Sequence, residues 1–176
     1  MYNEIQPRLR VNRTTSMAIN TTWQKIDFNG ASTTNINTFG KDPVSGNNMV
    51  WWDSSGKLFR FYEQNDQNYD CTMFLSTTTN LITVKATLQY RCVIPNAGGA
   101  GVNKYFPFPD DATPYVDMAD ATLLATQVNH KAEKIPLYLE SSIRANGFWI
   151  EVKLSNSLIT LGTCTLNNAA VLIQGK

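Results

Sequence analysis

The single histidine, His130, is the residue best suited to acid–base chemistry near neutral pH. Lys131, Glu133 and Lys134 follow it in a polar stretch, which predicts a solvated surface histidine rather than a general base. A metal centre built from several histidines is excluded within one chain that has only one. The sequence therefore offers no histidine-based catalytic site.

The three cysteines, Cys71, Cys92 and Cys164, are the next candidates for metal or redox chemistry. They lack the Cys-x-x-Cys spacing of a zinc site, and three cysteines permit one disulfide at most. Cys92 falls on a predicted apolar strand face, where a free cysteine behaves as a small hydrophobe. Because no basic leader with an apolar run opens the chain, we expect no signal peptide and assembly in a reducing cytoplasm.

Two loops contain residue types that could bind a phosphate or a cation. The glycine-rich segment 98–104 is followed by aromatic and proline residues, where a phosphate-binding loop would open a helix. An acidic patch lacks EF-hand spacing, so calcium there is only a minor alternative; it comprises Asp110, Asp111, Asp117 and Asp120. No Gly-x-Ser-x-Gly motif occurs. We predict no catalytic residue, no metal and no cofactor, so the chain is not expected to be an enzyme.

Tryptophans provide candidate contact residues, of which Trp149 is the best. Its neighbours Phe148 and Ile150 would lie on the opposite face of a strand, which leaves Trp149 pointing outward. Trp51 and Trp52 are further candidates. Two interpretations stay open for these three residues: stacking on a glycan, or packing in a subunit interface. We favour the interface, because oligomers need apolar residues on outward faces.

Residues 82–94 are the clearest structural element, because every second side chain is apolar or nearly so. Such alternation is typical of a strand with one buried and one solvated face. Similar strands are predicted around the turns 53–56 and 146–147, and residues 116–128 fit a strand or a short helix. Threonine and asparagine together outnumber all charged residues, as expected of strand faces and tight turns. The sequence predicts an all-β fold, an antiparallel two-sheet jelly-roll sandwich.

The N-terminal segment contains half of the arginines, Arg8, Arg10 and Arg13, and lacks clear periodicity. We expect residues 1–20 to form an extended N-terminal arm and residues 21–176 to form a single jelly-roll domain. The net charge of the whole chain is only +1, so nucleic acid and anionic membranes are not expected partners. No apolar run is long enough for a membrane span.

Five short segments of the sequence, taken together, resemble a known protein family. They are 23–29 (Trp-Gln-Lys-Ile-Asp-Phe-Asn), 91–96 (Arg-Cys-Val-Ile-Pro-Asn), 106–111 (Phe-Pro-Phe-Pro-Asp-Asp), 147–152 (Gly-Phe-Trp-Ile-Glu-Val) and 169–173 (Ala-Ala-Val-Leu-Ile). The set resembles the trimeric, tumour-necrosis-factor-like jelly-roll proteins of tailed bacteriophages, which decorate or cement capsids or serve as head fibres. The likeness spans residues 20–174.

The resemblance implies a homotrimeric structural protein of the virion, assembled in the host cytoplasm and without catalysis. The expected role is a capsid decoration (cement) protein on the outer surface of a phage head. The major capsid protein would be its partner, bound through Arg8, Arg10 and Arg13 of the arm. The alternative role is a phage fibre or receptor-binding domain that recognises host surface glycans.

Overall fold

The computed structural model describes residues 6–28, 36–41, 45–62, 68–80, 86–107, 115–123, 127–155 and 163–176. Within this part, thirteen strands accompany one short helix. The elements are β1 Arg8–Arg13, β2 Met17–Ile19, β3 Gln24–Lys25, β4 Ile36–Phe39, β5 Val50–Asp53, β6 Leu58–Phe61, β7 Tyr69–Asn80, β8 Ala86–Ile94, β9 Lys104–Phe106, β10 Val116–Leu123, β11 Gln127–Ile135, α1 Ser141–Asn146, β12 Trp149–Leu154 and β13 Thr163–Gly175.

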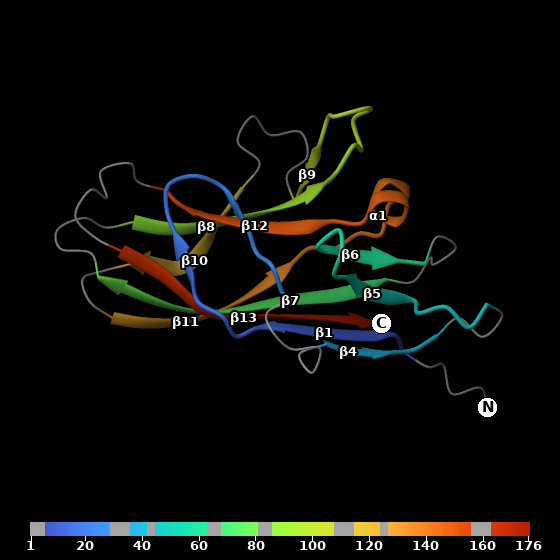
Figure 1. The fold of residues 1–176 in the computed structure, drawn as a ribbon, viewed down its shortest axis with the longest axis horizontal. Coiled ribbons are helices and arrows are strands. Elements are labelled where there is room, and N and C mark those ends of the chain that lie inside the picture. The colour runs from blue at the N-terminus through green and yellow to red at the C-terminus, as the bar shows by residue number, and fades with distance from the viewer. Residues whose placement is uncertain are drawn as a thin grey trace.

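Two antiparallel sheets form the layers of a sandwich (Figure 1). The larger sheet has the order β11-β7-β13-β1-β4, with β2 beside β13. The smaller sheet has the order β10-β8-β12-β3, with β9 beside β8. The hairpin β5–β6 forms a separate two-stranded sheet. From β7 onward, the chain changes layer between β7 and β8, between β10 and β11, between β11 and β12, and between β12 and β13. The predicted all-β jelly-roll sandwich is therefore confirmed.

β7 and β8 lie in different layers and direct one row of side chains each into the core. Along β7, buried residues alternate with partly or fully exposed ones over its whole length. The inward positions of β8 include Leu88, Tyr90 and Cys92, each at most 1% exposed. Thr77 and Thr79 are buried and continue the inward row of β7. β-Branched threonine packs well on a sheet, even at an inward position.

An aromatic cluster fills the core where the β5–β6 hairpin closes the sandwich. The ring of Phe59 lies 4.9 Å from that of Trp52, 5.5 Å from that of Phe28 and 5.0 Å from that of Phe148, between centroids. Full burial of a side chain of this kind contributes about 2–3 kcal/mol to stability. The backbones of Phe59 and Phe148 also exchange two hydrogen bonds, of 2.8 and 3.0 Å. The hairpin is therefore fixed to the start of β12.

Gly147 is required at this junction. Its φ is +70°, and a Cβ there would collide with the carbonyl oxygen of Phe59. Gly147 also follows α1, and its N–H donates to the carbonyl of Ile143 at 2.8 Å.

Residues 116–128, for which the sequence left a strand or a short helix open, form strands: β10 covers Val116–Leu123 and β11 begins at Gln127. No helix of the described part is long and apolar enough to cross a membrane.

The structure corrects the predicted N-terminal arm, because residues 8–13 form a strand within the larger sheet. β1 pairs with β13 on one side and with β4 on the other. Leu9 and Val11 are fully buried, while Arg8 and Arg10 are exposed. The segment does alternate with a period of two, but long charged side chains on its outward face concealed that pattern. The proposed boundary at residue 20 does not separate these residues from the domain.

Candidate functional site

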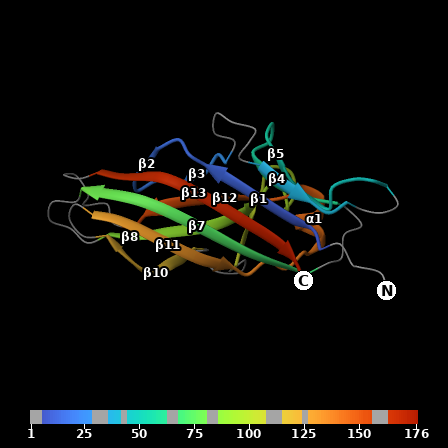
Figure 2. The same ribbon diagram turned by 90° about the horizontal axis from the view of Figure 1, so that it is seen from below.

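The strands of the larger sheet lie side by side in Figure 2. Their outward side chains form the first candidate surface, called the arginine face. Residues paired directly across neighbouring antiparallel strands point to the same side of a sheet. Arg10 pairs with Leu172 and Leu172 pairs with Thr72, while Phe74 pairs with Ala170 and Ala132. The arginine face comprises Arg8, Arg10 and Asn12 of β1, Asn168, Ala170 and Leu172 of β13, Thr72, Phe74 and Ser76 of β7, and His130, Ala132 and Lys134 of β11.

The centre of the arginine face is apolar and hollowed. Phe74 is 43% exposed although its strand is in the middle of the sheet. A hollow of about 420 Å³ lies over this centre and is lined by Arg8, Arg10, Phe74, Ala170, Val171 and Leu172. A second hollow of about 480 Å³ shares Arg10, Phe74 and Ala170 and extends toward β11. Together they form one groove along β13, bordered by β1 and β7, which we call the β13 groove.

The charges around the β13 groove have one sign. Arg8 and Arg10 border it on β1, and Lys131 lines its end at β11. No carboxylate lines either hollow among the described residues. Asp70, at the start of β7, is paired with Lys176 at 2.9 Å. The groove therefore presents a positive potential to an approaching chain.

Arg13 has a different role from the other two arginines predicted to bind the capsid. Its NH1 group donates a hydrogen bond of 2.7 Å to the backbone carbonyl of Asp27, which follows β3. Arg13 is half-buried, whereas Arg8 and Arg10 are exposed on the outward side of β1. The structure thus brings Arg8 and Arg10 together on one face and uses Arg13 to connect the two sheets.

The outward side chains of the smaller sheet form a second surface, called the tryptophan face. It comprises Trp23, Lys25, Gln89, Arg91, Tyr105, Tyr115, Asp117, Trp149, Glu151 and Lys153. Arg91 and Glu151 form an ion pair of 2.8 Å, with side chains 18% and 14% exposed. The indole N–H of Trp149 donates to the other oxygen of Glu151 at 2.8 Å. One carboxylate therefore holds a guanidinium and an indole.

Cations cover the aromatic rings of the tryptophan face. Lys25 Nζ lies 4.2 Å from the ring centroid of Trp149, and the Arg91 guanidinium lies 4.4 Å from that of Trp23. Lys153 Nζ lies 4.7 Å from the same Trp23 ring. Such cation–π contacts are favourable and shield the ring face from other ligands. The cations of this face are therefore engaged in contacts within the molecule.

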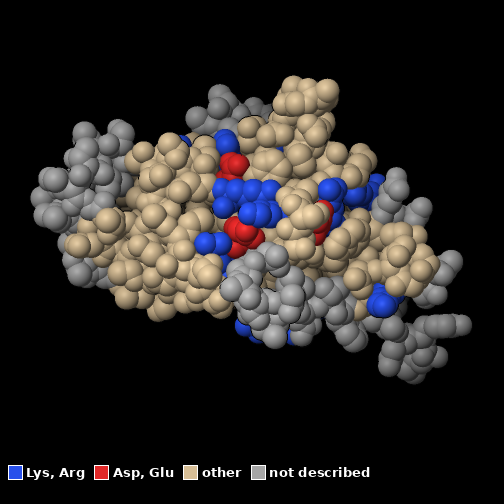
Figure 3. Space-filling view, viewed as in Figure 1, with Lys and Arg blue, Asp and Glu red and all other residues tan. Residues whose placement is uncertain are grey.

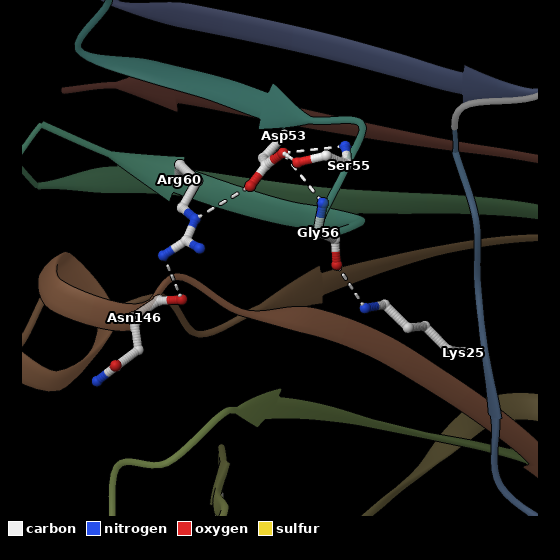
Figure 4. A network of polar contacts seen from close by, with 6 residues as sticks. All are labelled: Lys25, Asp53, Ser55, Gly56, Arg60 and Asn146. Carbon is white, nitrogen blue, oxygen red and sulfur yellow. Dashed lines mark hydrogen bonds and ion pairs between the residues drawn. The ribbon is translucent and has the colours of Figure 1, made fainter.

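Lys25 also ties the tryptophan face to the β5–β6 turn (Figure 4). Its Nζ donates to the carbonyl of Gly56 at 2.9 Å. Burial lowers the pKa of Lys25, with a smaller lowering from nearby Lys57. Asp53 holds the turn itself, since one carboxylate oxygen accepts from the Gly56 N–H at 3.1 Å and from the Ser55 hydroxyl at 2.7 Å. These two hydrogen bonds, Gly56 first, lower the pKa of Asp53.

Arg60 completes this network on the side of α1. Its Nε lies 3.5 Å from the second carboxylate oxygen of Asp53, and its NH1 donates to the Asn146 carbonyl at 2.9 Å. Lys57 and Asp27 form a further ion pair of 2.7 Å. Figure 3 shows basic and acidic side chains adjoining in the middle of the face seen in Figure 1, while most of that face is uncharged. The charges there are largely paired.

The three predicted tryptophans occupy different environments. Trp149 points outward from β12, as its alternation with buried Phe148 and Ile150 predicted. Trp51 is half-buried on β5. Trp52 is only 6% exposed and packs edge-on against Phe28, so its assignment as a contact residue is wrong. The two adjacent tryptophans point to opposite sides of β5, and the inward side meets the core.

The remaining candidate residues for chemistry lie either on the surface or in the core. His130 is exposed on β11, as the sequence indicated. Cys71, Cys92 and Cys164 are free and buried. Burial raises the pKa of Cys164 to about 12 and raises that of Cys71 still further. The residues that the structure describes contain no cluster of three or more histidine, cysteine or acidic side chains able to hold a metal ion; Asp110, Asp111 and the side chain of Asp120 lie outside them.

Phe74 is the residue that the sequence interpretation missed. The buried positions Cys71, Met73 and Leu75 already define the inward row of β7, so Phe74 must face outward with Thr72. A large aromatic residue on the outward side of a strand is the signal that indicates a contact surface. The same reasoning was applied to Trp149 but not to Phe74.

Comparison with known proteins provides little further information. No family model matches the chain, and no curated protein matches its sequence. Among solved structures, the chain is similar to PRD1 vertex protein P5, with 12% sequence identity and a TM-score of 0.38. The similarity covers 96% of this chain and 71% of that chain. A likeness at this level carries no argument about function.

Proposed function

We propose that the chain is a structural protein of a bacteriophage virion, a decoration protein that binds the outer surface of the head as a homotrimer. The five sequence segments that resemble phage jelly-roll proteins and the confirmed all-β sandwich support this proposal. The observation that carries it is the arginine face, where an exposed aromatic residue, a groove and two arginines that form no ion pair with a described residue lie together. Such a surface is suited to binding another protein chain.

The major capsid protein is the proposed partner, and Arg8 and Arg10 are the proposed contact residues. Both belong to a paired strand of the sheet, so their backbone loses little conformational entropy when they bind. Catalysis has no part in this proposal. The protein would bind the head surface through side chains of its larger sheet rather than through a flexible arm.

Co-sedimentation with phage heads that lack this chain tests the proposal. We expect saturable binding by the wild type and loss of binding after the double charge reversal Arg8→Glu/Arg10→Glu. Lys104→Glu is the matched control, because Lys104 is an exposed cation on the other sheet. Sedimentation equilibrium should give the mass of a trimer. Equal binding by both reversed variants would contradict the proposed surface.

Deletion of residues 1–18 is unsuitable for this test. It would remove all of β1, including the buried Leu9 and Val11, and the larger sheet would lose a strand between β13 and β4. Loss of binding by such a truncation would report unfolding rather than a lost contact. Outward point substitutions avoid this problem.

The second candidate function is a fibre or receptor-binding domain that recognises host glycans. The outward position of Trp149 on the tryptophan face favours it. Binding to a glycan array, lost in Trp149→Ala without a change in assembly, would support this role. A decoration protein should give no saturable signal on the array.

A further inference from the structure

We propose that the β13 groove binds an extended acidic polypeptide segment, with carboxylates on Arg8 and Arg10 and an apolar side chain against Phe74. This inference deepens the proposed function by naming the chemistry of the partner segment. It rests on that function only for the source of the segment, which would be the capsid surface. The binding itself can be measured without phage heads.

The two sides of the groove differ in chemistry. Arg8 and Arg10 form the β1 side, and Phe74 forms the β7 side, with Ala170 and Leu172 between them on β13. Neighbouring strands in a sheet lie about 4.8 Å apart, so the two outer strands are separated by roughly twice that distance. This width accommodates one extended chain lying above β13.

The spacing along β1 matches an extended ligand. Arg8 and Arg10 are two residues apart on one strand, so they are about 6.8 Å apart along it. Alternate side chains of any extended peptide have the same spacing and point to the same side. Two carboxylates separated by one residue can therefore face the two guanidiniums, and the residue between them faces Phe74. The arginines favour carboxylates because their planar groups can form two hydrogen bonds with each.

Charge complementarity favours an acidic partner over a second copy of this chain. No carboxylate lines the described part of the groove. Among the residues with described side chains, the exposed carboxylates are Asp70, Asp117 and Glu140, which lie on three different parts of the fold. They form no strip that could fill the groove of a neighbouring copy. The described part of the chain thus offers no acidic strip of its own, and the proposed partner is a different chain with closely spaced acidic residues.

Fluorescence anisotropy with the full chain tests the inference. The probe is the labelled heptapeptide Gly-Ser-Glu-Leu-Glu-Ser-Gly, compared with a version in which glutamine replaces both glutamates. We expect the glutamine peptide, or the Arg8→Glu/Arg10→Glu variant, to lower the affinity at least about tenfold. Phe74→Ala should lower it about threefold, since part of the apolar contact is lost. Lys104→Glu should stay within about twofold, because it lies on the other sheet.

Three outcomes would overturn the inference. They are equal affinity for the two peptides, equal or tighter binding of a ten-nucleotide oligothymidine, and dissociation of the oligomer by Phe74→Ala, which would identify a second copy as the occupant. Failure of the proposed function is distinguishable from these. Peptide binding by a chain that does not bind heads would leave the groove assignment intact and refute only the virion role.

Discussion

The two outer faces of the sandwich contain similar residues but use them differently. On the tryptophan face, Arg91 is held by Glu151 and Lys25 lies over Trp149. On the arginine face, Arg8 and Arg10 form no ion pair with any described residue, and Phe74 remains exposed. The two faces therefore differ in whether their cations form ion pairs or cation–π contacts within the described part of the molecule. A guanidinium without an ion pair retains its capacity to bind a carboxylate, which is the reason for proposing the arginine face as the contact surface.

The largest expected effect tests whether β1 is part of the framework of the arginine face. Leu9→Ala should lower the free energy of unfolding by about 3 kcal/mol, because it leaves a cavity at a fully buried position. The neighbouring outward substitution Arg10→Ala should change it by less than about 0.5 kcal/mol. Urea unfolding measures both variants. If Leu9→Ala were as stable as the wild type, residues 8–13 would behave as an arm and not as a strand.

The next effect concerns the internal pairing of the tryptophan face. Glu151→Ala should cost about 2 kcal/mol, because the largely buried Arg91 guanidinium and the Trp149 indole both lose their acceptor. Asp70→Asn is the matched control, since it breaks an exposed pair with Lys176 and should cost less than about 1 kcal/mol. Thermal unfolding of the two variants gives the comparison. Equal stabilities would mean that the two faces do not differ in how they use charge.

The smallest effect is the pH dependence contributed by the β5–β6 turn beside the tryptophan face. The pKa of Asp53 is lowered in the folded state, so its contribution is present above the pKa of the unfolded state. The contribution is lost as the pH falls through the lower, folded-state pKa. Asp53→Asn should therefore reduce stability by about 1 kcal/mol at pH 7 and reduce the loss of stability on acidification. Urea unfolding between pH 7 and pH 2 measures this, and parallel pH profiles for variant and wild type would refute it.

Sequence reasoning succeeded where the controlling interactions are local. The β5–β6 hairpin was predicted from residues 53–56, and the turn is indeed held by Asp53 hydrogen bonds to its next neighbours. The outward position of Trp149 followed from simple alternation. Both depend on only a few consecutive residues, which a sequence displays directly.

The failures have non-local causes. β1 was not predicted, because its partner β13 is distant in the sequence and its partner β4 lies in a turn-rich stretch. In addition, its arginines resemble those of a solvated terminus. The hydrogen bond from Lys25 to Gly56 joins residues 31 positions apart, and nothing near either residue indicates it. The groove depends on the register of three strands, which pair only in the folded sheet.

Hydroxyl-radical footprinting of the chain, free and bound to phage heads, tests the central claim most directly. Phe74 and Tyr138 are both exposed, at 43% and 78%, but Tyr138 does not line the β13 groove. The account predicts that head binding protects Phe74 from oxidation and leaves Tyr138 as reactive as before. Unchanged labelling of Phe74 in the bound chain would contradict it.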